Sequence, residues 1–323
     1  MVRIAVIDDV DADAHDISRL AEKASVSVYE GVPVEADKII ERAREAEVVI
    51  CSWTKMSREV LTQLPRLRLL SVWATGVDNV DLAAASELGV TVCHVPSYAT
   101  GAVAELTLGL MLSVMRKIPA ADRDVRLTGS INWQAFQGTE ISGKKLGIVG
   151  TGMIGQRVAR VGHSLGMSLL GHDLQPSDAL VCDLGMTYVP LRRVFAESDI
   201  ISLHLPLTRD TERMVDATLL DLMQKTSIII NTARAHLLQQ DDLFDSLYKR
   251  RIAGAGLDDV DLECESGRRL LKLENVVFTP HIGFNTTEAA RKKTAICVEN
   301  VLGFLEGTPI NVVDYRPSPA CGR

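Results

Sequence analysis

The chain has 323 residues, which suits two ordinary domains, and 46% of them are hydrophobic. The net charge is −7 and no block of five Lys or Arg occurs, which argues against binding to nucleic acids or anionic membranes. The early acids Asp8 and Asp9 and the lack of a long apolar run argue against a signal peptide or a membrane span. The six cysteines form no CxxC pair, so we expect reduced thiols in a cytoplasmic protein, with no metal site.

Short runs rich in β-branched residues alternate with helix-patterned stretches along the whole chain. This alternation is typical of βαβ units and parallel sheets. The strands predicted in the first part of the chain are Arg3–Ile7, Val48–Cys51, Leu69–Val72 and Thr91–His94. Residues Ala102–Arg126 then predict one long apolar helix. The later predicted strands are Lys145–Val149, Ser168–Gly171, Ile200–His204, Ser227–Asn231, a run ending at Leu257, and Val276–Thr279.

A glycine-rich turn follows the predicted strand Lys145–Val149 directly. Gly150, Gly152 and Gly155 have the GxGxxG spacing of dinucleotide-binding turns, whose helix N-terminus binds a pyrophosphate. A turn without a ligand is the alternative for this motif alone. The next strand leads to Asp173, the position where an acid binds the adenosine ribose, and no Arg follows, so NAD is favoured over NADP. Because this motif marks the first strand of a nucleotide-binding domain, most earlier residues belong to another domain.

Polar residues also follow the later predicted strands. His204, Arg234, Asp258 and His281 each come at or just after a strand end, and an acidic loop continues to Glu263. Singly, such residues are commonly structural: a histidine with its bonds satisfied, a surface ion pair, a solvated loop. Ligands of open parallel sheets bind at the carboxyl edge, so the gathering of these residue types there favours a catalytic site.

These motifs, in this order, resemble the D-isomer-specific 2-hydroxyacid dehydrogenase family over nearly the whole chain. The resemblance implies an α/β fold of two doubly wound parallel-sheet domains. A Rossmann NAD-binding domain of residues 99–284 would be inserted into a flavodoxin-like substrate domain of residues 1–98 and 285–323. It also implies an NAD-dependent enzyme that interconverts a small 2-oxo acid and a D-2-hydroxy acid, and a homodimer formed through Ala102–Arg126. The motifs that carry it are Leu69–Asp81, Val103–Glu105, Gly150–Gly155, His204–Pro206, Asn231–Arg234, Leu257–Asp258 and Thr279–Gly283.

The resemblance also assigns roles to single residues. Arg234 resembles the arginine that binds the substrate carboxylate, and His281 the acid/base that protonates the forming alkoxide. Glu263 resembles the carboxylate that orients the imidazole and favours its charged form. The expected substrate contacts are the backbone of Ala74, Thr75, Gly76 and Val77, with Tyr98 and Arg234. The expected cofactor contacts are Gly150, Gly152, Met153, Ile154, Gly155, Asp173, His204, Leu205, Pro206, Thr211, Thr232, Ala233, Arg234, Asp258, His281 and Gly283.

The chain departs from the family pattern in two site segments. Ala235 and His236 follow Arg234, where the family has Arg-Gly after Asn-Thr-Ala, and Cys264 replaces a proline, which leaves Glu265 as a rival to Glu263. Trp53, in the loop expected to face the substrate, either narrows the pocket or caps a surface loop.

The function has alternatives on the same fold, and the particular 2-oxo acid stays open. An NAD-sensing regulator or corepressor is the alternative from another class, because a fold does not decide a function. Formate- and phosphite-oxidising relatives share the scaffold, but a formate-type site would have Gln in place of Glu263.

Overall fold

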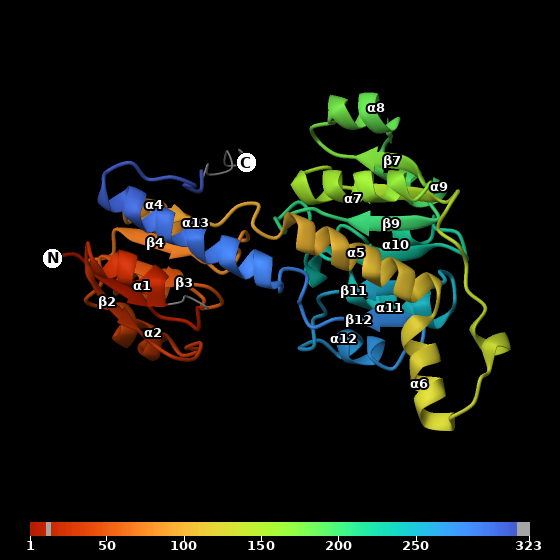
Figure 1. The fold of residues 1–323 in the computed structure, drawn as a ribbon, viewed down its shortest axis with the longest axis horizontal. Coiled ribbons are helices and arrows are strands. Elements are labelled where there is room, and N and C mark those ends of the chain that lie inside the picture. The colour runs from red at the N-terminus through yellow and green to blue at the C-terminus, as the bar shows by residue number, and fades with distance from the viewer. Residues whose placement is uncertain (11–13, 315–323) are drawn as a thin grey trace, which may run out of the picture. The chain divides into compact units, whose positions relative to one another are not determined.

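The computed structural model describes residues 1–10 and 14–314, which form two compact units. The first unit contains Met1–Tyr98 and the chain from Thr286 onward, and the second contains Ala99–Asn285. Each unit has a parallel sheet covered by helices, which confirms the predicted fold class (Figure 1). Residues 315–323, assigned above to the substrate domain, lie outside the described range.

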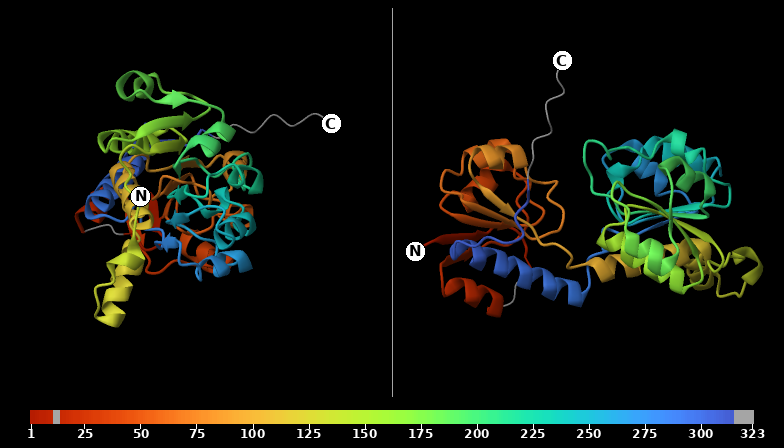
Figure 2. Two further views of the ribbon diagram at one scale, coloured as in Figure 1. Left: turned by 90° about the vertical axis from the view of Figure 1, so that its right-hand side faces the viewer. Right: turned by 90° about the horizontal axis from the view of Figure 1, so that it is seen from above.

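The first unit has a five-stranded parallel sheet in the order β2-β1-β3-β4-β5. This order is that of flavodoxin-like folds. The central strands are buried on both faces, which explains their continuous apolar sequence. The strands are β1 (Arg3–Val6), β2 (Ser25–Val28), β3 (Val48–Cys51), β4 (Leu69–Val72) and β5 (Thr91–Cys93). The helices are α1 (Ala14–Ala21), α2 (Ala36–Ala43), α3 (Arg58–Thr62), α4 (Leu82–Glu87) and α13 (Thr287–Leu305), of which α13 packs beside α1 and β4 (Figure 2).

The second unit has a seven-stranded parallel sheet in the order β12-β11-β10-β9-β6-β7-β8. Counted from β6, this is the Rossmann strand order, and it reverses between β6 and β9. The strands are β6 (Lys145–Val149), β7 (Ser168–His172), β8 (Thr187–Tyr188), β9 (Ile200–Leu203), β10 (Ile228–Asn231), β11 (Gly254–Leu257) and β12 (Val276–Phe278). The helices are α5 (Thr100–Met115), α6 (Ile118–Thr128), η1 (Trp133–Phe136), α7 (Met153–Ser164), α8 (Asp178–Leu184), α9 (Leu191–Glu197), α10 (Ala217–Leu220), η2 (Ala235–Leu237), α11 (Gln240–Tyr248) and α12 (Glu265–Leu270).

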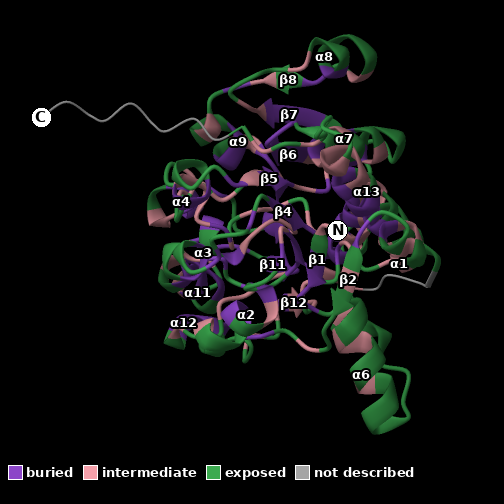
Figure 3. Cartoon of the chain, turned by 90° about the vertical axis from the view of Figure 1, so that its left-hand side faces the viewer, coloured by how far each residue is buried: buried purple, intermediate pink, exposed green. Residues whose placement is uncertain are grey.

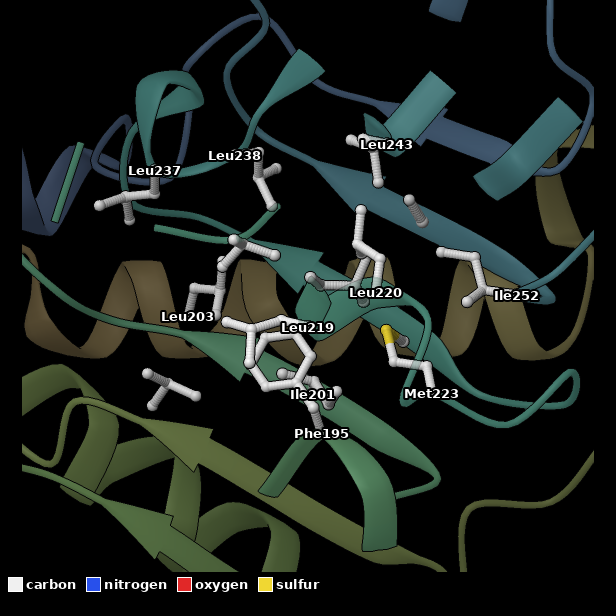
Figure 4. Close-up of a cluster of buried hydrophobic side chains, with 14 of the residues drawn as sticks. Phe195, Ile201, Leu203, Leu219, Leu220, Met223, Leu237, Leu238, Leu243 and Ile252 are labelled. Carbon is white, nitrogen blue, oxygen red and sulfur yellow. The ribbon is translucent and has the colours of Figure 1, made fainter. Parts of the chain in front are cut away.

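Aliphatic side chains fill both faces of the seven-stranded sheet. On one face, α9, α10 and α11 contribute to a cluster that includes Phe195, Ile201 and Leu220 (Figure 4). On the other face, α5 and α7 pack on residues such as Ile148 and Ile230. Figure 3 shows the buried residues concentrated in the strands and in the inner faces of the helices. Because both faces are covered, the loops at the strand ends are the parts of the sheet open to a ligand.

The predicted helix Ala102–Arg126 is two helices, so the prediction of one continuous helix is wrong. The break lies at Lys117, whose φ of 54° is left-handed. Pro119 has no N–H to donate to the Met115 carbonyl, and that carbonyl instead accepts the N–H of Thr139 at 3.0 Å. Although α5 is strongly apolar, no helix within residues 1–10 and 14–314 combines the length and apolarity needed to cross a membrane.

The edge strands β2 and β8 are absent from the sequence prediction. Each pairs with one neighbouring strand, and the residues of β2 are largely exposed. A Ser-Val-Ser-Val segment at a solvated edge lacks the continuous apolar run by which the inner strands are detected. The inner strands agree with the prediction to within one residue at each end.

Candidate active site

The turn between β6 and α7 is shaped by three glycines. Gly150 has a φ of 92°, and a Cβ there would lie 2.6 Å from the carbonyl oxygen of His204. A Cβ at Gly155 would lie 2.0 Å from the Gly150 oxygen, so helix and turn can approach this closely only without a side chain. Gly152 has open space around its Cβ position, and α7 begins at Met153 without a side-chain cap. Open space beside an uncapped helix N-terminus fits the pyrophosphate of a dinucleotide.

Asp173 lies beside this turn, directly after β7. Its Oδ2 accepts the Thr151 N–H at 2.5 Å and the Thr151 hydroxyl at 3.0 Å, while Oδ1 accepts the Gln175 N–H at 2.9 Å. Burial raises the pKa of Asp173, but the hydrogen bonds from Gln175 and Thr151 outweigh this and lower it. Tyr188 donates its hydroxyl to Thr151 at 2.9 Å, so Tyr188 and Thr151 together hold a charged carboxylate at the end of β7.

The segment after β9 is held by its own side chains. His204 Nε2 lies 2.8 Å from the Ser202 hydroxyl, and burial lowers the pKa of His204 to about 4, so this imidazole is neutral near pH 7. Thr211 donates to the Pro206 carbonyl at 2.6 Å, which closes the loop that carries Leu205 and Pro206. This loop meets the glycine turn at the reversal of strand order, where dinucleotides bind in such sheets.

Arg234 lies in a turn after β10 that Asn231 closes. The buried Asn231 donates its amide N–H to the Arg234 carbonyl at 2.8 Å and accepts the Ala233 N–H at 3.0 Å. The Thr232 hydroxyl lies 2.9 Å from that of Thr107 on α5. Two short-range bonds and one contact to a core helix therefore fix the backbone on which the half-buried Arg234 is mounted.

His281 lies in a loop after β12 that the carboxylate of Asp258 holds together. Asp258 is 3% exposed and accepts the Thr279 hydroxyl at 2.6 Å, the Ile282 N–H at 2.9 Å and the Gly283 N–H at 2.8 Å. His281 has a φ of 55°, an uncommon conformation for a residue with a side chain, and donates its N–H to the Asp258 carbonyl at 2.6 Å. The family resemblance names Asp258 as a cofactor contact, and in the structure its carboxylate organises the histidine loop.

The carboxylate that faces His281 is Asp259. Its Oδ1 lies 3.8 Å from Nδ1 of His281, and its Oδ2 accepts the Ala235 N–H at 3.0 Å. Glu263 is exposed, and within the described residues its carboxylate makes no hydrogen bond or ion pair. Glu265 is also exposed, at the start of α12. The structure therefore brings Asp259, and neither predicted glutamate, to the histidine.

The sequence does not single out Asp259, because it lies in a run from Asp258 to Glu263 that has the pattern of an acidic loop. The usable signal was position: Asp259 follows β11 directly, between the strands that precede Arg234 and His281. Successive residues of an extended segment point to opposite sides, so Asp258 and Asp259 can contact different neighbours.

Among the described residues no group of three or more His, Cys, Asp or Glu could hold a metal ion.

The predicted substrate contacts of the first unit gather at the carboxyl edge of its own sheet. After β4, Thr75 donates its hydroxyl to the Val95 carbonyl at 2.8 Å, and Ala74 accepts the Val95 N–H at 2.9 Å. These bonds fix the backbone that leads into Gly76 and Val77. Tyr98 is 8% exposed, and its ring centroid lies 5.2 Å from the Lys293 ammonium.

The loop after β3 is anchored by a buried carboxylate. Asp8 Oδ2 accepts the N–H groups of Ser52, Trp53 and Thr54 at 2.6, 2.7 and 3.0 Å. The Trp53 side chain is nevertheless 55% exposed. The loop therefore has an anchored backbone and presents an exposed indole.

Comparisons with known proteins agree with this architecture. Residues 108–283 match the model of the D-isomer specific 2-hydroxyacid dehydrogenase NAD-binding domain. The chain is 35% identical to a glyoxylate reductase of Thermococcus litoralis, over 85% of this chain and 86% of that protein. It is 35% identical to D-3-phosphoglycerate dehydrogenase of Methanocaldococcus jannaschii over 95% of this chain, but spans 58% of that protein's length. A solved acyclic imino acid reductase, Bsp5, in complex with NADPH and D-Arg has a TM-score of 0.90 and 31% identity, covering 97% of this chain and all of that one.

Proposed function

Since the chain belongs to the D-isomer-specific 2-hydroxyacid dehydrogenase family, we propose that it interconverts a 2-oxo acid and a D-2-hydroxy acid with NAD as the hydride carrier. One observation carries the proposal. Arg234 and His281 follow β10 and β12 at the carboxyl edge of the sheet that holds the glycine turn, and Asp259 lies between them after β11. A guanidinium and an imidazole at that edge match the needs of an anionic substrate with a reducible carbonyl.

The roles of the residues follow from the charges that the reaction develops. NADH supplies the hydride when bound, and Gly150, Gly152, Asp173 and the start of α7 are the groups that would hold it. Arg234 binds the substrate carboxylate with a planar two-pronged donor and so orients the carbonyl. His281 gives its proton to the carbonyl oxygen as negative charge builds there, and it takes the proton back in the reverse direction. Family resemblance names Glu263 as the partner of that imidazole, whereas the geometry favours Asp259 for this role.

The family resemblance assigns further substrate and cofactor contacts, which the proposal retains. The backbone of Ala74–Val77 would hold the other end of the carboxylate, and Tyr98 would contact the substrate. On the cofactor side the proposal retains the remaining positions named from the sequence, which are Met153, Ile154, Gly155, His204, Leu205, Pro206, Thr211, Thr232, Ala233, Asp258 and Gly283.

We also propose that the protein works as a cytoplasmic homodimer. The helix α6 contains no buried residue (Figure 3). The arm from α6 to η1 exposes Leu127, Ile131 and Trp133 at 79, 90 and 75%. Large apolar side chains gathered on one exposed segment commonly mark a protein–protein interface. A second copy of the chain would cover them.

The activity is tested by NADH oxidation with glyoxylate, hydroxypyruvate, pyruvate, phenylpyruvate and 3-phosphohydroxypyruvate. Each acid is assayed with and without ammonia, because the similar solved structure is an imino acid reductase. We expect turnover of at least one 2-oxo acid without ammonia. NADH binding without turnover of any of them would contradict the proposal and favour the regulator.

The substrate role of Arg234 is tested in the same assay. We expect Arg234→Ala to lose roughly 3 kcal/mol or more in kcat/KM, which is over a hundredfold, because the substrate anion loses a charged two-pronged partner. The NADH dissociation constant should change little. Arg192→Ala, which removes an exposed arginine of α9, is the matched control. A near-normal kcat/KM for Arg234→Ala would mean that another residue binds the substrate carboxylate.

A further inference from the structure

We propose that Asp259 is a positioning residue that joins the proton donor His281 to the turn that carries Arg234. The inference rests on the proposed function and deepens it. One carboxylate is shared between two segments that come from different strands. Its Oδ1 faces His281 Nδ1 at 3.8 Å, and its Oδ2 accepts the N–H of Ala235, the neighbour of Arg234, at 3.0 Å.

The backbone around Asp259 holds this geometry in place. Asp259 directly follows Asp258, whose carboxylate accepts three hydrogen bonds from residues 279–283. The left-handed conformation of His281 is held by its N–H bonds to the carbonyls of Asp258, at 2.6 Å, and Thr279, at 3.0 Å. The histidine loop is thus bonded to Asp258, and its His281 faces the carboxylate of the next residue, Asp259. The ring of Phe284 also lies beside the imidazole, with a distance of 5.9 Å between the two ring centroids.

Asp259 is charged in this environment. Burial raises its pKa, but the contact with His281, the Ala235 N–H and the charge of Arg234 lower it more, so its pKa lies below the usual range. Asp259 and His281 are only 29 and 30% exposed, so water screens their interaction incompletely. Among the described residues, Asp259 after β11 faces the imidazole, the charge of Arg234 after β10 acts on that same carboxylate, and the backbone carbonyl of Asp258 accepts the His281 N–H.

A carboxylate at Nδ1 has two consequences for proton transfer at Nε2. It favours the tautomer that carries a proton on Nδ1, which leaves Nε2 to exchange a proton with the substrate oxygen. It also stabilises the protonated ring, which is the form that ketone reduction consumes. The shared bond to Ala235 adds a third consequence, because displacement of Asp259 would shift the Arg234 turn and the imidazole together.

The test removes the charge of Asp259 while keeping the shape of its side chain. Asp259→Asn retains an oxygen for the Ala235 N–H, and Glu274→Gln, which removes an exposed carboxylate just before β12, is the matched control. We follow the imidazole signal of His281 by NMR against pH, assigned through its loss in His281→Asn, and the pH profile of kcat/KM for reduction. In Asp259→Asn both the NMR titration midpoint and the falling limb of the profile should move to lower pH, with an unchanged control.

The two readouts separate this inference from the proposed function. The NMR titration needs no substrate, so it tests the Asp259–His281 pair even if no 2-oxo acid is turned over. An unmoved midpoint in Asp259→Asn, or a midpoint that moves in Glu263→Gln instead, would overturn the inference. Thermal unfolding and NADH binding of each variant verify that folded protein is compared.

Discussion

At the scale of single residues, Asp173 is the group expected to decide between NADH and NADPH. Its carboxylate is charged and held by Thr151 and Gln175, so it would repel a 2′-phosphate and accept hydrogen bonds from ribose hydroxyls. We expect NADH to be preferred at least about tenfold, or about 1.4 kcal/mol. Fluorescence titrations with both cofactors measure this preference. Asp173→Ala should erode it, whereas Asp178→Ala, on the exposed start of α8, should not. A wild-type preference for NADPH, the cofactor seen with Bsp5, would contradict the role of Asp173.

His204 is expected to make the stability of the protein sensitive to acid. Burial lowers its pKa to about 4, while an unfolded histidine titrates near about 6.5. The unfolded chain therefore takes up the proton first, and the free energy of unfolding falls as the pH drops from about 6.5 to about 4. Urea unfolding at pH 7 and pH 4.5 should show that His204→Gln loses about 2 kcal/mol less than wild type over this interval. Equal losses in the two proteins would contradict the assignment.

At the scale of elements, two glycines of the β6–α7 turn are expected to have different roles. Gly155 is needed for packing, and Gly152 is needed for cofactor binding. We expect Gly155→Ala to lower Tm, at a cost of about 1–3 kcal/mol, because its Cβ would lie 2.0 Å from the Gly150 oxygen. Gly152→Ala should leave Tm unchanged, since nothing lies within 4 Å of that Cβ, yet weaken NADH binding by crowding the pyrophosphate. Calorimetry and NADH titration measure the two effects. Tight NADH binding by Gly152→Ala would contradict the assignment of this turn to the cofactor site.

At the scale of the whole molecule, the proposed dimer is tested through the α6–η1 arm. Leu127→Ser combined with Trp133→Ser should yield a monomer of 35.2 kDa by size exclusion with light scattering, because it removes large exposed apolar surface. Val34→Ser, which changes a 90% exposed residue of the first unit, should stay dimeric. A double variant that keeps the wild-type mass would assign the interface elsewhere, and a monomeric wild type would refute the dimer.

Much of the fold could be predicted because inner parallel strands have a clear local pattern. Val48–Cys51, Leu69–Val72 and Lys145–Val149 are strands with the predicted bounds, since both their faces are buried and only apolar side chains suit them. The edge strands and the break at Lys117 could not be predicted in this way. An edge strand such as β2 forms because it pairs with one neighbouring strand. The helix breaks where the Met115 carbonyl accepts the N–H of Thr139 instead of an N–H of the next helical turn.

The candidate site could likewise be predicted only in part from the sequence. The sequence alone indicated the glycine turn, Asp173, Arg234 and His281, because strand ends at one edge of a parallel sheet must converge. Only the tertiary structure decided which carboxylate faces His281. The family resemblance points to Glu263, but a carboxylate acts over a few ångströms, and the path of the loop after β11 brings Asp259 to that distance. Chain order is a local property that the sequence determines, whereas contact between side chains depends on how separate loops pack.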